Sequence, residues 1–128
     1  MSRGDEGGEL TMATGPYQFY WYNSFSCRPT MMVELARPHL ARGGRVRFQL
    51  PLADGRILVV IEFADGIGMV EGPQNRQDFK FACVPDVLDS LLNLNAITGG
   101  RVTSIVPYGA NQILVSMELL KVPDNSRR

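Results

Sequence analysis

The sequence predicts an α+β domain in which one βαββ unit occurs twice, giving a largely antiparallel sheet with approximate two-fold symmetry and two helices on one of its faces. The first observation is an internal repeat: residues 25–63 align without a gap on residues 81–119, and 13 of the 39 aligned positions are identical. The second is the order of patterns within each copy. Alternating apolar residues precede a stretch with helical spacing, a Gly-Gly pair and two apolar stretches joined by a turn.

The first element of each unit is a strand. In the first unit the stretch PYQFYWYNSF places six aromatic rings within nine positions. Successive side chains of a strand point to opposite faces, so Phe19, Trp21 and Phe25 are predicted to face the helices and to form the core. Tyr20 and Tyr22 are then predicted to lie on the opposite, exposed face.

A helix follows each strand. Thr30 and Asp86 each follow a proline, and each is predicted to cap a helix by accepting hydrogen bonds from the amides of its first turn. The glycine pairs at 43–44 and 99–100 are predicted to end the helices, because glycine adopts the left-handed conformation common just past a helix end. Pro38 lies within the first helical stretch, so that helix is predicted to be shorter or kinked.

Two strands joined by a turn complete each unit. RVRFQL and RILVVIEF flank PLADG in the first unit, and RVTSIV and QILVSMELL flank PYGAN in the second. The last strands contain apolar residues on both faces, at 57–63 and 113–120, which is typical of strands that are covered on both sides. They predict either a central position under a second sheet or subunit, or pairing of their edges with another chain. Both routes lead to a homo-oligomer or a protein partner.

The expected boundaries are a flexible N-terminal tail at 1–15, a single domain at 16–122 with units at about 17–64 and 73–120, and a flexible C-terminus at 123–128. The Gly-rich residues 64–75 are expected to form a short surface connection between the units. Met12 is a candidate for the natural start of the chain.

Charge and hydropathy exclude several classes. Lys and Arg number 13 and Asp and Glu number 13, so the formal net charge is +0 and predicts no general attraction to nucleic acid or an anionic membrane. The longest apolar runs are too short to cross a bilayer, and the N-terminus lacks the pattern of a secretory signal. The cytoplasm is therefore the expected location, where Cys27 and Cys83 would remain reduced thiols.

The second copy, from its helix through Gly99-Gly100 to VTSIVPYGANQILVSMEL, resembles the ending of a family of short, functionally uncharacterised bacterial domains. In that family a helix, a Gly-aromatic pair, a Val-rich strand, a Pro-Gly turn and a last strand follow one another. Here Gly100-Arg101 stand where the family usually has a tryptophan. The resemblance covers roughly a third of the chain and implies a fold; it implies no activity and no functional residue.

No residue pattern predicts an enzyme, a cofactor or a metal site. His39, the only histidine, has no serine or carboxylate at a telling distance and is interpreted as a surface residue. Cys27 and Cys83 are equivalent in the repeat and are interpreted as buried apolar residues, with a redox bridge or half of a metal site as the alternative. Glu62 and Glu118 are also equivalent, and each is expected to reach a strand edge, a solvent face or an arginine of a neighbouring strand.

Binding has the stronger support. The strand alternation is predicted to place five residues on the face away from the helices: Tyr20, Tyr22, Arg45, Arg47 and Lys80. The leading hypothesis is a non-enzymatic protein interaction or assembly module that acts through this face and the apolar last strands. The second is single-stranded nucleic-acid binding, because exposed tyrosines can stack on bases while arginines hold phosphates; the first unit carries six arginines against three acidic residues. The third is a small ligand bound where the two repeats meet.

Overall fold

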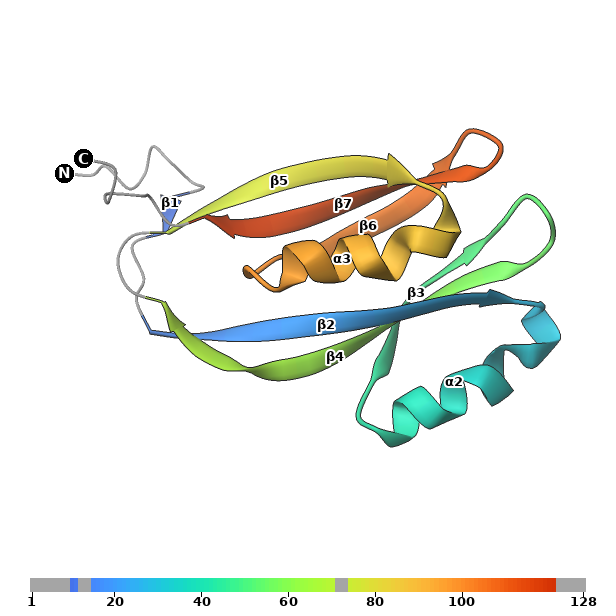
Figure 1. The fold of residues 1–128 in the computed structure, drawn as a ribbon, viewed down its shortest axis with the longest axis horizontal. Coiled ribbons are helices and arrows are strands. Elements are labelled where there is room, and N and C mark those ends of the chain that lie inside the picture. Colours follow the sequence, from blue (N-terminus) through green and yellow to red (C-terminus); the bar gives the residue numbers. More distant parts are fainter. Residues whose placement is uncertain (1–9, 12–14, 71–73, 122–128) are drawn as a thin grey trace.

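A computed structural model describes residues 10–11, 15–70 and 74–121 of the chain (Figure 1). It confirms the α+β class, with the predicted strands in antiparallel sheets and two helices. Along the chain the elements are β1 (Leu10–Thr11), β2 (Gly15–Cys27), the 3-10 turn η1 (Pro29–Met31), α2 (Met32–Ala41), β3 (Arg45–Pro51), β4 (Ile57–Val70), β5 (Gln74–Cys83), the 3-10 turn η2 (Pro85–Val87), α3 (Leu88–Ala96), β6 (Arg101–Tyr108) and β7 (Gln112–Lys121).

The strands form two separate sheets. The first sheet has the order β2-β4-β3, and the second has the order β1-β5-β7-β6, with every pairing antiparallel. The sequence predicted a common sheet, because a local pattern fixes strands but does not state which strands become neighbours. Each sheet instead contains the three long strands of one unit, with the last strand of the unit at its centre.

The two βαββ segments have the same strand register. Cys27 pairs with Ile57 in the first sheet, and the equivalent Cys83 pairs with Ile113 in the second. A β-bulge interrupts the β3/β4 ladder after Val46, and another interrupts the β6/β7 ladder at the equivalent point after Val102. The aligned residues of the two sequence copies therefore occupy equivalent backbone positions.

The helices lie on opposite sides of the first sheet. α2 covers the face that carries Trp21 and Val59, and these residues form one core cluster with Ala36 of the helix. α3 lies between the two sheets (Figure 1) and packs with Tyr22 and Val60 from the opposite face of the first sheet. The predicted placement of both helices on one face is therefore wrong. The reason is that the first sheet is apolar on both faces, and the second unit covers the face that α2 leaves open.

Differences between the copies follow from this stacking. Tyr22 and Val60 are fully buried between the units, whereas the equivalent residues of the second unit are the exposed Asp78 and the half-buried Ser116. The outer face of the second sheet has no third unit against it within the described chain. Polar residues at these positions suit contact with water, as in the terminal units of stacked repeats.

The helix starts differ from the prediction. Thr30 and Asp86 lie inside η1 and η2, and neither helix has a side-chain hydrogen bond at its N-cap position. A proline at the start of each 3-10 turn begins the helical backbone earlier than the predicted caps. Pro38 lies within α2, which at 10 residues is not shorter than α3 with 9, so the predicted shortening does not occur.

The Gly-Gly pairs end both helices as predicted, and the two glycines of a pair have different roles. Gly43 and Gly99 have φ values of 95° and 103°, a backbone conformation that favours glycine. Gly44 is required for close packing instead: a Cβ atom there would lie 2.6 Å from Cγ2 of Ile61 and 2.7 Å from the ring of Phe63. The pair thus reverses the chain and brings it directly onto the sheet.

The expected connection and termini differ in part. β4 continues to Val70 and pairs with the start of β2, so residues 64–70 are strand rather than surface loop. The ring of Phe19 covers Gly68, where a Cβ would lie 2.5 Å from it. Leu10 and Thr11, expected in a flexible tail, pair with β5. The expectations for Met12 and residues 123–128 lie outside the described residues.

Candidate functional site

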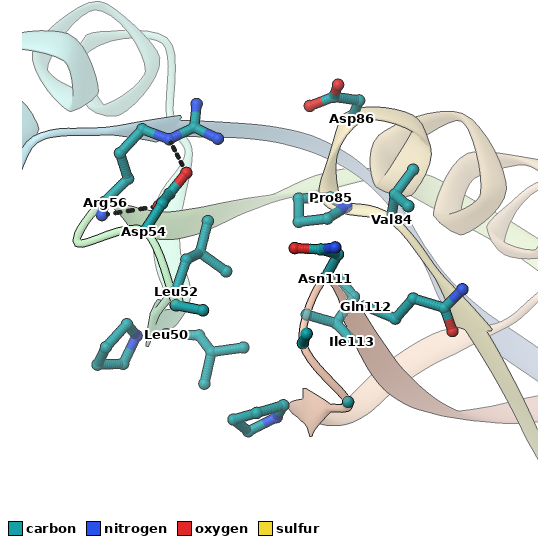
Figure 2. Close-up of a pocket in the computed structure, with 15 residues that line it drawn as sticks. Leu50, Leu52, Asp54, Arg56, Val84, Pro85, Asp86, Asn111, Gln112 and Ile113 are labelled. Atoms are coloured by element: carbon teal, nitrogen blue, oxygen red, sulfur yellow. Dashed lines mark hydrogen bonds and ion pairs between the residues drawn. The ribbon is translucent and has the colours of Figure 1, made fainter.

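A groove opens between the turn ends of the two units (Figure 2). Its volume is about 470 Å³, within the range of about 300–1,000 Å³ found for ligand sites. One wall is the β3–β4 hairpin, and the other combines the start of η2 with the β6–β7 hairpin. The lining residues are Leu50, Pro51, Leu52, Ala53, Asp54, Arg56, Val84, Pro85, Asp86, Pro107, Gly109, Ala110, Asn111, Gln112 and Ile113.

The groove combines apolar walls with a few polar groups. Figure 2 shows Leu50 and Leu52 on one side, facing Val84, Pro85 and Ile113 on the other. These residues supply apolar surface from both units. A ligand in the groove would therefore contact both sheets at once.

Two charged residues at the edge of the groove, Asp54 and Arg56, form an ion pair with each other. The carboxylate of Asp54 accepts hydrogen bonds from the backbone amide of Arg56 at 3.0 Å and from its Nε at 2.8 Å. These hydrogen bonds hold the pKa of Asp54 below its usual value. Asp86, on the opposite wall, has no ion-pair partner among the residues that the structure describes. The rim therefore carries one unpaired negative charge.

The second candidate is a cluster of arginines around Glu62, at the other end of β3. Tyr22 donates its hydroxyl hydrogen to Oε2 of Glu62 at 2.8 Å, and the same hydroxyl accepts the backbone amide of Val102 at 3.1 Å. Arg101 donates from Nε and Nη2 to the two carboxylate oxygens, at 3.1 and 3.0 Å. Arg45 donates to Oε1 at 3.1 Å. The buried carboxylate thus joins both sheets through hydrogen bonds.

Arg47 and Tyr20 complete the arginine cluster. Nε of Arg47 lies 3.5 Å from Oε2 of Glu62, and its Nη2 donates to the backbone oxygen of Val102 at 3.0 Å. The guanidinium carbon of Arg101 lies 4.3 Å from the ring centre of Tyr20, within cation–π range. The name arginine cluster is used below for Tyr20, Tyr22, Arg45, Arg47, Glu62 and Arg101.

Protonation in the arginine cluster follows from burial and hydrogen bonding. Burial by itself would raise the pKa of Glu62, but hydrogen bonds from Arg101, Tyr22 and Arg45 outweigh it and lower the pKa below the usual value. Burial raises the pKa of the Tyr22 phenol, and the neighbouring Glu62 raises it further. At neutral pH Glu62 is therefore a carboxylate and Tyr22 a neutral hydrogen-bond donor. Neither is tuned to exchange a proton near pH 7.

The structure brings together four of the five predicted binding residues, although not on an open face. Tyr22 has 0 % exposure, so its predicted position on an exposed face is wrong: the second unit covers that side of the first sheet. Tyr20 is half-buried, whereas 64 % of the Arg45 side chain and 29 % of the Arg47 side chain are exposed. Lys80 is exposed but belongs to β5 of the second sheet.

The β3 bulge changes the predicted alternation along that strand. Strict alternation from Arg45 would place Phe48 on the opposite face, under α2, but Phe48 packs in the same cluster as Tyr22. An extra residue in one strand shifts every later side chain to the other face. Trp21 and Phe25 do pack under α2 as predicted, with Trp21 stacked on Phe63 at a centroid distance of 4.0 Å.

The residues considered for catalysis or metal binding, His39, Cys27 and Cys83, are packed against or buried among other side chains. His39 is half-buried, stacks on Phe25 and contacts the Asn23 amide at 3.3 Å. Cys27 and Cys83 are buried free thiols, and burial raises the pKa of Cys83. Among the described residues, no three His, Cys, Asp or Glu side chains group in a way that could hold a metal ion.

The sequence predicted a ligand where the two repeats meet, and an arginine of a neighbouring strand as one possible partner of Glu62, but it named no residue of the groove and did not predict that Glu62 joins the two units. A signal for Glu62 was present, because Arg45 faces Glu62 across β3 and β4 and the equivalent Arg101 faces Glu118 across β6 and β7. The recurrence of an Arg–Glu pair at equivalent positions indicates ionic contacts, and in the structure Arg101 bonds to Glu62 of the first unit. No comparable signal marks the groove, because its walls come from three separate turns.

Comparison of the chain with protein-family models, curated proteins and solved structures finds no match. Neither described helix is long and apolar enough to cross a membrane.

Proposed function

We propose that the protein is a non-catalytic binding module that holds a short segment of a partner protein in the groove between its two units. The observation that carries the proposal is the groove itself: about 470 Å³ of space with apolar walls contributed by both units. Concave apolar sites with a few polar groups are the usual places for ligands.

Apolar surface near the groove favours a protein segment. Val84, which lines the groove, is 40 % exposed, and Leu50, Leu52 and Ile113 add apolar surface from the other turns. Apolar surface of this kind around a concave site is typical of surfaces that bind other proteins. A segment of several residues can contact all of these turns at once.

The rim charge indicates what that segment carries. Arg56 is already paired with Asp54 on one wall, whereas Asp86 on the other wall has no ionic partner within the described part of the chain. A lysine or arginine next to an apolar residue would complement both the walls and Asp86. The proposed ligand is therefore a short extended segment with an apolar side chain followed or preceded by a basic one.

The test is selection from a random peptide display library on the wild-type protein. Val84→Lys serves for counter-selection, because the exposed Val84 can be changed without opening the core and a lysine there would repel the basic residue of the ligand. Selected peptides are expected to pair an apolar with a basic residue and to shift the amide NMR signals of Leu52, Val84 and Asn111. Val33→Lys on the exposed surface of α2 is the matched control and should bind as the wild type does. Peptides that bind both Lys variants equally, or whose shifts map to α2, would refute the proposal.

A small organic ligand is the second candidate, favoured by a groove volume in the range of such sites. Fragment screening by NMR separates the two. Fragments that bind below millimolar concentration at Leu52 and Ile113, with no peptide selected, would favour the small ligand.

Other partners have less support. Single-stranded nucleic acid remains a proposal without Tyr22 as a stacking residue, because that ring is buried. The case for a homo-oligomer is also weaker, since β4 is covered on both faces within one chain. A cytoplasmic setting agrees with the free thiols of Cys27 and Cys83.

A further inference from the structure

The arginine cluster holds more positive than negative charge. Arg45, Arg47 and Arg101 all lie within 3.5 Å of the single carboxylate of Glu62. Glu118 lies opposite Arg101 in the strand register, and even with it included the cations outnumber the carboxylates. An unbalanced group of guanidinium ions attracts an anion.

Comparison of the units identifies the extra cation. Arg45 and Glu62 of the first unit correspond to Arg101 and Glu118 of the second, a balanced pair. Arg47 corresponds to Thr103, which is neutral. Arg47 is also the residue that the β-bulge adds to β3. Bulges often aim a side chain at a particular place, and here the added side chain points to the same carboxylate as Arg45.

Hydrogen-bonding capacity remains on these two arginines. Each guanidinium has five N–H donors, and Arg45 contacts Glu62 through Nη2 while 64 % of its side chain is exposed. Nε of Arg47 is buried beside Glu62 and cannot reach a ligand, but no hydrogen bond within the described residues uses its Nη1, and 29 % of the side chain is exposed. Arg101 differs, because both its Nε and its Nη2 are bonded to Glu62 and its plane lies over Tyr20. Arg45 and Arg47 are therefore the side chains that can receive a ligand.

Glu62 also holds these arginines in place before a ligand arrives. The carboxylate is buried, its pKa is lowered, and it accepts hydrogen bonds from both sheets. A guanidinium that is already oriented loses less conformational entropy on binding than a free surface arginine. The geometry combines a fixed anchor with solvent-accessible donors.

We propose that Arg45 and Arg47 form a binding site for an oxyanion, either a phosphoryl or a carboxylate group, at the edge strand β3. Guanidinium groups match both kinds of anion through paired N–H···O hydrogen bonds. The site lies at the opposite end of β3 from Leu50 and Pro51 of the groove, so it does not depend on the proposed function.

The test is an NMR titration of the arginine Nε–Hε signals with inorganic phosphate and, separately, with succinate. Potassium chloride at matched ionic strength and pH is the reference. The Hε signals of Arg45 and Arg47 are expected to shift saturably with at least one oxyanion and not with chloride. The oxyanion that binds with the lower Kd shows whether the site takes a phosphoryl or a carboxylate group.

Arg45→Gln is expected to weaken that binding about tenfold, the loss of one charge-assisted contact. Arg37→Gln removes an exposed arginine of α2, outside both the groove and the arginine cluster, and should bind as the wild type does. If Arg45→Gln impairs folding, Arg45→Lys keeps the charge without the paired donors and should also bind more weakly. Shifts that chloride reproduces, or equal weakening in Arg45→Gln and Arg37→Gln, would overturn the site.

Discussion

Replacing Tyr22 by phenylalanine tests the hydrogen-bonded junction of the two units. The substitution keeps the buried ring and removes only the hydroxyl, which donates to Glu62 and accepts from the amide of Val102. No large cavity forms. The effect on stability therefore reports on these two hydrogen bonds.

The expected loss of stability is estimated from the hydrogen bonds that Glu62 and the Val102 amide would lose. A buried amide without an acceptor, here that of Val102, costs about 1–3 kcal/mol, and a hydrogen bond to a charged group contributes about 1.5–3 kcal/mol. The two contributions depend on the same hydroxyl, so their energies do not add fully. Tyr22→Phe is therefore expected to lower the free energy of unfolding by about 2–4 kcal/mol. For a domain stable by about 5–15 kcal/mol this is a large fraction.

Urea denaturation followed by far-UV circular dichroism measures this difference. Tyr108→Phe is the control, because Tyr108 is 52 % exposed and its change is expected to stay within about 0.5 kcal/mol. An effect of Tyr22→Phe as small as that of the control would show that the hydroxyl does not stabilise the junction. The reasoning on Glu62 would then fail as well.

Three further predictions concern the core, the α3 contact and pH. Gly44→Ala places a methyl group 2.6 Å from Ile61 and should destabilise by about 1–3 kcal/mol in urea denaturation. Asn93→Ala leaves the amide and carbonyl of Tyr22 without their partners at 2.7 and 2.8 Å and should cost about 2 kcal/mol, whereas the exposed Ser90→Ala should stay within about 0.5 kcal/mol. The pKa of Glu62 is lowered in the folded state, so its contribution is complete above the unfolded value near 4.5 and is lost as the pH falls through the folded value. Thermal denaturation from neutral to acidic pH should therefore show a shallower acid decline for Glu62→Gln than for the wild type, and parallel curves would contradict this.

The sequence was sufficient for the local parts of the fold because the repeat presents each signal twice. The strands, the hairpin turns and the Gly-Gly helix ends occur at equivalent positions, and Trp21 lies under α2 as its alternation predicts. These features depend on residues close together in the chain. They were predictable from backbone preferences and side-chain period alone.

The arrangement of the layers was not predictable in the same way. The alternation placed Tyr22 on the face away from α2, correctly, but could not show that α3 and the second sheet cover that face. The β3 bulge could not be predicted from the sequence pattern either, and strict alternation would place Phe48 on the wrong face. The groove requires three turns to converge in space. Each of these depends on contacts between residues far apart in sequence.

The position of α3 makes the first half of the chain dependent on the second. A fragment that ends at Val70 would expose Tyr22, Leu58 and Val60, all buried in the complete chain. During synthesis this surface stays uncovered until residues 88–96 have left the ribosome. Because the same polypeptide supplies that helix, its docking onto the first half does not depend on protein concentration.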